Sequence, residues 1–270
     1  MHDQPFSPSR IDSAVRAWGA AFRIITSAEP TMRHYAGRQE THVVFTGSQA
    51  ASTNGVFSFS APPDPDEIAL LAGRAAETAA QYPEFAPWCV QVRGRPDERI
   101  RREAARHGLT DESWEPFMVR DLDRSPSTDA DAAPGSPELR IRAVSGAEHD
   151  LYLTAMSTGF QVPKEVFAAL FTPAVINAPA VTAYIGEVDG EAVCTAMGVV
   201  TDGHVGVFNV STAPAHRKRG LGARMTEHVV RAGHHAGART AYLRASEMGL
   251  GVYESVGFST AEHWTYLSAP

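Results

Sequence analysis

Cysteine is scarce in this sequence: Cys89 and Cys194 are the only two among 270 residues. Each lies in an apolar segment far from a second cysteine, so neither a disulfide nor a CxxC redox or metal motif is indicated. We expect two buried structural thiols. Neither lies near the motifs described below, which argues against a covalent intermediate on cysteine.

Long apolar runs are also missing. No uninterrupted hydrophobic stretch approaches the roughly 18 residues typical of a membrane-spanning helix. The first residues show no basic segment followed by an apolar one, as a secretory leader would. We therefore expect a cytoplasmic protein without a membrane partner. With 270 residues and 43% hydrophobic content, the chain is long enough for two globular domains.

An excess of positive charge is absent as well. The net charge is −7, a balance unlike that of a general nucleic-acid binder, so we expect no nucleic-acid partner. The 11 histidines show no HxxxH or HExxH spacing, and we expect no metal. Within the C-terminal half, however, basic residues crowd into one short segment, residues 217–224. Such a concentration predicts either an anionic partner or a solvated face.

The clearest break in composition is residues 123–138, which read DRSPSTDADAAPGSPE. Pro, Ser, Asp, Ala and Gly dominate there and no hydrophobic periodicity survives, as is typical of a linker. This segment predicts one domain over residues 1–122 and a second over residues 139–270.

The second domain shows alternating strand-like and helix-like patterns. Asp-Gly pairs at 189–190 and 202–203 predict hairpin turns between strands. Leu221, Met225 and Val229 recur at helical spacing and predict an amphipathic helix. The expected order is strand 139–144, helices 146–159 and 163–176, strands 181–190, 191–200 and 204–212, helix 219–236, strand 240–246, a short helix ending at 256, and a final strand. This order predicts an α/β fold with a mixed sheet.

The segment from Arg217 to Gly222 joins the end of a predicted strand to the start of a predicted helix. A helix N-terminus has unpaired N–H groups and the positive end of the helix dipole, so it binds anions. Glycines at 220 and 222 let a phosphate approach the backbone, and Arg217, Lys218 and Arg219 add positive charge. The pattern therefore predicts a site for an anion such as a phosphate.

Arg217-x-x-Gly220-x-Gly222 resembles motif A of the GNAT superfamily of acyl-CoA-dependent N-acetyltransferases. The resemblance covers residues 139–270 and implies a splayed, mostly antiparallel sheet flanked by helices, with acetyl-CoA as co-substrate. The implied cofactor contacts are the backbone of the motif strand, the amides and basic side chains of the loop, and one loop position after the next strand: Val210, Thr212, Arg217, Lys218, Arg219, Gly220, Leu221, Gly222, Ala223 and Ser246.

A second match lies downstream. Residues 253–258, YESVGF, resemble the Tyr-x-x-x-Gly-Phe of the same superfamily, in which the tyrosine commonly protonates the departing thiolate of CoA. A phenol with a pKa of about 10 is a suitable acid toward a thiolate whose thiol has a pKa near 8.5. The resemblance therefore implies Tyr253 as the catalytic acid; a core aromatic is the structural alternative.

The sequence departs from the superfamily pattern at two places. Ser246 stands where many members have an asparagine, which puts one cofactor contact in doubt. Many members also have a glutamate on the motif A strand as general base, but residues 204–212 contain no carboxylate. The base is therefore unassigned, with His204, Glu262 and His263 as candidates on strands beside the expected cleft.

The N-terminal half repeats the later part of this order. It shows strands at 41–47 and 54–60, a helix at 65–81, a strand at 87–93, a helix at 96–107 and a strand at 114–121. At the position of motif A, prolines remove N–H donors and Asp64-x-x-Glu67 predicts a capping box. We expect a degenerate GNAT-like domain without a cofactor site, a layout that resembles the tandem arrangement of mycothiol synthase.

These observations predict an enzyme that transfers the acetyl group of acetyl-CoA directly to a primary amine. A small-molecule amine is the preferred acceptor, because a second domain over the cleft would restrict access; a homodimer is compatible with the sequence. Lysine side chains of proteins are the alternative substrate. A non-catalytic acyl-CoA-binding regulatory module is the alternative function, and retention of Tyr253 favours catalysis.

Overall fold

The computed structural model describes residues 6–123 and 138–270. Its strands are β1 (Arg33–Ala36), β2 (Thr41–Phe45), β3 (Gly55–Ser58), β4 (Cys89–Arg93), β5 (Asp111–Asp121), β6 (Arg140–Val144), β7 (Val181–Val188), β8 (Glu191–Thr201), β9 (His204–Thr212), β10 (Thr240–Arg244) and β11 (Ser259–Ser268). Its α-helices are α1 (Pro8–Ala28), α2 (Pro65–Gln81), α3 (Glu98–Arg106), α4 (His149–Phe160), α5 (Glu165–Ala168), α6 (Pro173–Ile176), α7 (Leu221–His235) and α8 (Leu250–Ser255). Short 3-10 turns are η1 (Ala51–Thr53), η2 (Pro83–Phe85), η3 (Gly146–Glu148) and η4 (Pro214–His216).

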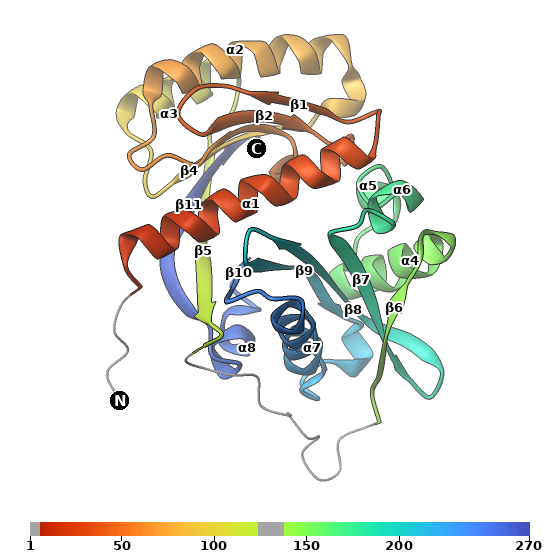
Figure 1. The fold of residues 1–270 in the computed structure, drawn as a ribbon. Helices are drawn as coiled ribbons and strands as arrows, with labels where there is room; N and C mark the ends of the chain where they lie inside the picture. Colours follow the sequence, from red (N-terminus) through yellow and green to blue (C-terminus); the bar gives the residue numbers. More distant parts are fainter. Residues whose placement is uncertain (1–5, 124–137) are drawn as a thin grey trace.

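The described strands form one 11-stranded sheet in the order β1-β2-β3-β4-β11-β5-β10-β9-β8-β7-β6 (Figure 1). Neighbouring strands are antiparallel except for the pairs β3–β4 and β9–β10, which are parallel. The expected α/β fold with a mostly antiparallel sheet flanked by helices is therefore confirmed. None of the helices in the described ranges has the length and apolar character needed to cross a membrane.

Most predicted elements are present within a few residues of their expected bounds. The prediction of one helix over residues 163–176 is wrong, because this segment forms two short helices, α5 and α6. Thr172 caps the second piece by accepting a hydrogen bond from the Val175 amide, and Pro173 occupies its first turn. Proline starts a helix well and interrupts one in its interior. Residues 124–137 of the predicted linker lie outside the described residues.

Two elements, α1 and β1, were not predicted from the sequence. In α1 the buried residues Val15, Trp18 and Ile25 follow helical spacing, so a periodic signal was available. The strand β1 has only four residues, none of them buried, and such an edge strand has little pattern to find. The omission of α1 matters most, because this helix covers the site described below.

The last strand of each half is inserted beside strands of the other half. β11 pairs with β4, from Trp264↔Arg93 to Ser268↔Cys89, and along its other edge with β5. β5 in turn pairs with β10, from Thr240↔Asp121 to Arg244↔Phe117. Figure 1 shows β5 and β11 side by side at the centre of the molecule. The two halves thus share a continuous sheet.

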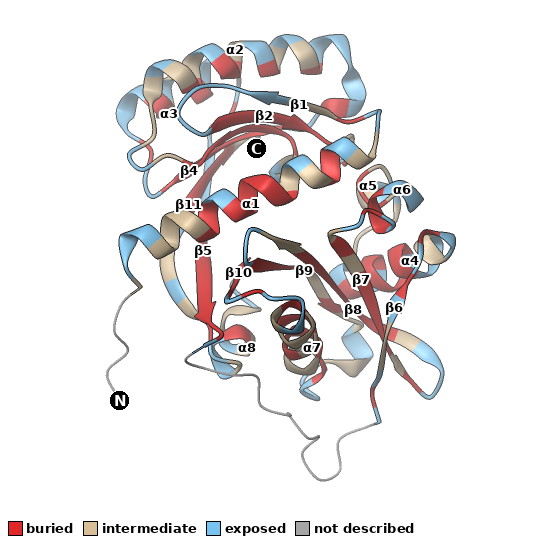
Figure 2. Ribbon diagram, in the orientation of Figure 1, coloured by how far each residue is buried: buried red, intermediate tan, exposed pale blue. Residues whose placement is uncertain are grey.

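Helices cover both faces of this shared region. On β5, Phe117 and Val119 pack under α1 together with Trp18, whereas Met118 packs in the cluster beneath α7. This alternation is that of a strand buried on both faces. Figure 2 shows α1 buried along the side that faces the sheet and exposed on the other. We refer to the two sides of the sheet as the α1 face and the α7 face.

Candidate functional site

The parallel strands β9 and β10 separate partway along their length. Their pairing consists of Thr240↔His204, Ala241↔Val205 and Tyr242↔Gly206, yet β9 continues to Thr212. Beyond Gly206, the N–H and C=O groups of β9 that face β10 have no ladder partner on that strand. Unpaired backbone groups in a partly buried setting need hydrogen-bond partners, so this edge can bind an extended ligand.

A β-bulge lies at the same level of the sheet. The register between β8 and β9 shifts between Thr195 and Met197, and Asn209 on β9 has a left-handed backbone with φ of 53°. The Thr195 hydroxyl donates a 2.8 Å hydrogen bond to the Asn209 carbonyl. The bulge therefore turns β9 away from β10 and is held in place by its neighbour.

The segment after β9 leads into α7 with an unusual backbone. Lys218 and Gly220 have φ of 61° and 73°, and Gly220 is the N-cap residue without a side-chain hydrogen bond to the helix. The first amides of α7 have no acceptor inside the helix. The expected anion site is thus an uncapped helix start beside the open edge of β9.

The two glycines of this segment differ in what the protein requires of them. Gly220 needs its left-handed conformation. At Gly222 the backbone is helical, and a Cβ would meet only Thr212 Oγ1 and Val252 Cγ1, each at 3.8 Å. Glycine lowers helix stability, by about 1 kcal/mol relative to alanine. Since protein packing does not require Gly222, a ligand close to the backbone is the better reason for it.

The basic side chains of the loop have different surroundings. Arg217 donates to two carbonyls, from Nε to Thr212 at 3.2 Å and from Nη2 to Gly159 at 2.7 Å. It therefore ties the loop to β9 and to the end of α4. The Arg219 guanidinium lies 3.1 Å from the His216 ring nitrogen Nδ1. Lys218, between the two arginines in sequence, is exposed.

The remaining predicted contacts lie around the same gap. Val210 is half-buried, and the Thr212 carbonyl is already used by Arg217. Leu221 is buried beneath α7, whereas Ala223 is half-buried in its first turn. Ser246 is exposed, and its hydroxyl accepts a 3.3 Å hydrogen bond from the Gly249 amide just before α8. Ser246 thus shapes the turn that positions Tyr253.

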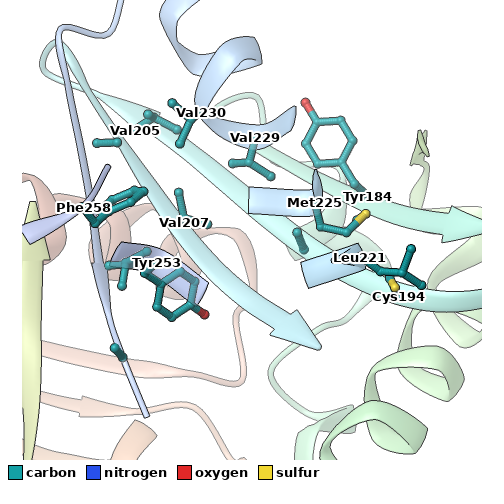
Figure 3. Close-up of a cluster of buried hydrophobic side chains, with 14 of the residues drawn as sticks. Tyr184, Cys194, Val205, Val207, Leu221, Met225, Val229, Val230, Tyr253 and Phe258 are labelled. Atoms are coloured by element: carbon teal, nitrogen blue, oxygen red, sulfur yellow. The ribbon is translucent and has the colours of Figure 1, made fainter. Parts of the chain in front are cut away.

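Tyr253 lies on α8, on the α7 face, with 9% of its surface exposed. Figure 3 shows its ring beside Phe258 and Val207 in the cluster that includes Leu221. Burial, reinforced by the negative charge of Glu115, raises the pKa of the Tyr253 phenol to about 12. The phenol therefore keeps its proton at neutral pH, as an acid must.

Glu115 is a carboxylate that no sequence motif singles out. It lies on β5, two residues before Phe117, and so on the α1 face of the strand. Tyr266 donates a 2.9 Å hydrogen bond from its hydroxyl to Glu115 Oε2. Arg244 Nε is 3.8 Å from the same oxygen. The carboxylate thus reaches the end of β10 from the N-terminal half, because β5 is inserted next to that strand.

The three candidate bases named from the sequence have other surroundings. His204 lies at the start of β9, paired with Thr240, whereas the gap opens toward the other end of the strand. Glu262 accepts two hydrogen bonds of 2.8 Å from Arg93. His263 is exposed against the Trp114 ring. Of the carboxylates and histidines considered, Glu115 alone has a charge that acts on Tyr253.

One inference about the cysteines is wrong. Cys194 is close to the motif, because it pairs with Thr212 across β8 and β9 and its Sγ donates toward Thr212 Oγ1 at 3.6 Å. Both cysteines are buried, as expected. Burial raises the pKa of both thiols, that of Cys89 to about 12. A buried, protonated thiol is a poor nucleophile, so direct transfer is still favoured.

The N-terminal half lacks the corresponding gap. β3 pairs with β4 over its whole length, from Gly55↔Cys89 to Ser58↔Val92. A Cβ at Gly55 would lie 2.0 Å from the Cys89 carbonyl oxygen, so the two strands are in close contact.

The predicted capping box at the start of α2 is half correct. Asp64 accepts hydrogen bonds from the amides of Asp66 and Glu67. Glu67 Oε1 accepts a 2.7 Å bond from the Arg38 amide rather than from the N-cap backbone. The carboxylate cap still occupies the place where an anion would bind. Among the described residues, no cluster of three or more His, Cys, Asp or Glu side chains could hold a metal ion.

Comparison with known proteins gives a family match and two similar folds. The model of the acetyltransferase (GNAT) family matches residues 149–258, which run from α4 to the residue before β11. A GCN5-related N-acetyltransferase from Kribbella flavida is similar in structure, with a TM-score of 0.66, 18% identity and 95% of each chain covered.

A functionally unknown conserved protein from Staphylococcus epidermidis is also similar, with a TM-score of 0.60, 11% identity, and 88% of this chain and 94% of that chain covered. At these identities the likeness shows a shared fold over nearly the whole chain. A search of curated proteins finds no match.

Proposed function

Residues 149–258 place the C-terminal half of the chain in the GNAT family of acetyltransferases, and from this membership we propose an acetyl-CoA-dependent N-acetyltransferase that acts on a primary amine of a small molecule. One observation carries the proposal: the open edge of β9 leads directly to the uncapped start of α7. A thioester cofactor with an extended arm and a pyrophosphate fits these two features together.

The residues around the gap fit acetyl-CoA. The amides from Lys218 to Ala223 would hold the pyrophosphate, with space at Gly222 for its approach. The free backbone edge of β9 around Val210 would hold the pantetheine arm. When bound, acetyl-CoA supplies the acetyl thioester that the amine attacks.

The acid and the base come from opposite faces of the sheet. Tyr253 belongs to the cluster on the α7 face, and Glu115 lies on the α1 face. The proposed step is direct: the amine nitrogen bonds to the acetyl carbon as the carbon–sulfur bond breaks. The amine proton passes to Glu115, and the Tyr253 hydroxyl gives its proton to the departing sulfur. In this arrangement the amine approaches the thioester from the α1 face, and the thiol leaves on the α7 face.

The position of α1 supports a small acceptor. The α1 helix covers the face on which Glu115 lies, with Trp18 only 3% exposed beneath it. Glu115 is partly exposed, with 38% of its side chain accessible, whereas Trp18 of α1 covers the neighbouring Arg244. We therefore expect a small amine to fit beside this helix more readily than a lysine on a folded protein.

We also propose that the N-terminal half is a degenerate copy of the same fold. Its strands β2, β3 and β4 with α2 and α3 repeat the order of β8, β9 and β10 with α7 and α8. The closed β3–β4 pair and the Asp64 cap support the loss of its cofactor site.

The test is CoA release from acetyl-CoA across a panel of small amines, with a lysine-containing peptide for comparison. We expect turnover with at least one small amine. Acetyl-CoA binding without CoA release for any acceptor would contradict an acetyltransferase and favour a binding module. Crystals grown with excess acetyl-CoA should contain one cofactor per chain, at α7; a second one beside Asp64 would contradict the proposed degeneration.

A further inference from the structure

A row of polar side chains crosses the centre of the sheet on the α1 face. Gln91 on β4 lies directly opposite Tyr266 on β11. Tyr266 donates to Glu115 on β5, and Glu115 approaches Arg244 at the end of β10. Each half of the chain contributes two of these four residues. Buried polar side chains need hydrogen-bond partners, so the contacts of each member of this row matter.

Arg244 is the centre of this row. Its side chain is 13% exposed, and its guanidinium carbon lies 4.6 Å from the Trp18 ring and 4.9 Å from the Tyr266 ring. The Nη1 group donates to Gln91 Oε1. The Glu115 oxygen at 3.8 Å from Nε is too distant for a hydrogen bond. The buried cation therefore has aromatic neighbours but no hydrogen-bonded carboxylate.

Three buried N–H donors in this cluster are unsatisfied. Arg244 Nε, Gln91 Nε2 and Trp18 Nε1 have no hydrogen-bond partner among the described residues. All three groups donate, and none can accept. Buried donors without acceptors are costly and uncommon in folded proteins. Three of them around one guanidinium point to an acceptor that arrives from outside the chain, and the positive charge favours an anion.

The cluster lies next to the proposed reaction centre. The Trp18 ring is 4.9 Å from the ring of Phe208, which lies on β9 just beyond the last pair with β10. Glu115, the proposed base, is the nearest carboxylate to Arg244. A ligand bound here would contact two protein groups of opposite charge, the Arg244 guanidinium and the Glu115 carboxylate.

We infer that Arg244 and Gln91 bind a carboxylate of the acceptor, and that the acceptor is a small amine with a carboxylate a few bonds from its nitrogen, such as an amino acid. The carboxylate pairs with the guanidinium, and the amine faces Glu115. This inference rests on the proposed function for the role of Glu115. The binding of the carboxylate at Arg244 can be measured without turnover.

The experiment compares matched ligands: L-leucine with L-leucinamide, and L-phenylalanine with L-phenylalaninamide. Each amide keeps the amine and the side chain and loses only the negative charge. Binding is measured by calorimetry in the presence of CoA, and turnover by CoA release from acetyl-CoA. In the wild type we expect at least one acid to bind on the order of 10- to 100-fold more tightly than its amide, the range of a charge-assisted hydrogen bond.

Two variants remove this preference by different means. Arg244→Met removes the positive charge. Gln91→Glu keeps Arg244 but places a carboxylate of the protein beside its guanidinium, where it competes with the carboxylate of the ligand. Both should bind acid and amide about equally while acetyl-CoA binding is unchanged. Arg239→Met is the matched control, since Arg239 is exposed, lies just before the other end of β10 and carries the same charge. It should keep the preference.

Equal binding of acid and amide by the wild type, or no binding of either acid, would overturn the inference. A preference for the acid that survives in Gln91→Glu would also overturn the inference. This variant keeps the buried arginine, so its result does not depend on whether Arg244→Met folds. Failure of the proposed function has a different signature: the acid binds at Arg244, but no CoA is released.

Discussion

The Tyr266 hydroxyl donates a 2.9 Å hydrogen bond to the Glu115 carboxylate, and this bond joins the last strand of one half to the last strand of the other. It orients Glu115 toward the end of β10, where the same carboxylate acts on Tyr253 and approaches Arg244. The proposed base thus belongs to the N-terminal half and is contacted by two residues of the C-terminal half. The proposed site, like the sheet, is built from both halves.

Replacing Glu115 tests this arrangement directly. Glu115→Gln should lower kcat by roughly 10²- to 10⁴-fold, the usual contribution of a positioned general base. It should also lower the pKa of Tyr253, because the negative charge that helps to raise it is gone. The second effect is measured by ultraviolet titration, with Tyr253→Phe used to identify the signal. Glu112→Gln on the same strand, whose carboxylate pairs with Arg101, should leave both unchanged.

Tyr253→Phe should separate chemistry from binding. The ring that packs against Phe258 is kept, so folding and acetyl-CoA binding should be normal. Loss of the proton donor should lower kcat by roughly 10²- to 10⁴-fold with little change in KM for acetyl-CoA. Because the pKa of Tyr253 is about 12, the wild-type phenol should not limit the rate at any pH below roughly 11. Wild-type turnover in the variant would remove Tyr253 from the mechanism.

Two substitutions at Gly222 distinguish folding from cofactor binding. A Cβ there meets its neighbours at 3.8 Å, so Gly222→Ala should fold and gain up to about 1 kcal/mol of stability from helix propensity. Gly222→Glu should also fold, but its negative charge at the pyrophosphate site should weaken acetyl-CoA binding on the order of 100-fold or more. Calorimetry and thermal unfolding measure the two effects. Unchanged affinity in Gly222→Glu would contradict the site.

The inserted strands predict that neither half is stable alone. Without β11, the fragment 1–123 has a gap between β4 and β5, and without β5 the fragment 138–270 has open edges on β10 and β11. Open strand edges promote aggregation. Each fragment should be insoluble by itself, and co-expressed fragments should assemble into a 1:1 complex that binds acetyl-CoA. A monomeric 138–270 fragment with the stability of the intact chain would show that the exchange is dispensable.

A buried histidine predicts acid sensitivity. Burial, followed by the charges of His34 and Arg23, lowers the pKa of His42 to about 4, against about 6.5 in an unfolded chain. Above pH 6.5 the imidazole is neutral in both states. Between about pH 6.5 and 4 only the unfolded state binds the proton, so acidification should cost up to about 3 kcal/mol of stability.

Urea unfolding at pH 7 and pH 4.5 measures this effect. His42→Phe, which retains a ring beside Phe59, should lose less stability on acidification than the wild type does. An identical loss in both proteins would mean that His42 is not buried in its neutral form.

Local signals led to part of the proposed site. The start of α7 was predictable because glycine at positions 220 and 222, basic side chains and the switch from strand to helix periodicity all lie within one short segment. Tyr253 was proposed from the resemblance of its short spacing to Gly257 and Phe258 to a family motif. The first turn of a helix and its anion-binding amides depend on residues adjacent in sequence.

Local patterns predicted most of the elements and the helix start of the proposed cofactor site, because periodicity and backbone conformation depend on residues close together in sequence. The exchange of β5 and β11, by contrast, is seen only in the folded sheet. That exchange brings Glu115 to Arg244, 129 positions away in the sequence, and Trp18 of α1 lies against Arg244. Strand pairing at such separation depends on which edges fit together in the folded sheet, and no pattern within either strand encodes its partner.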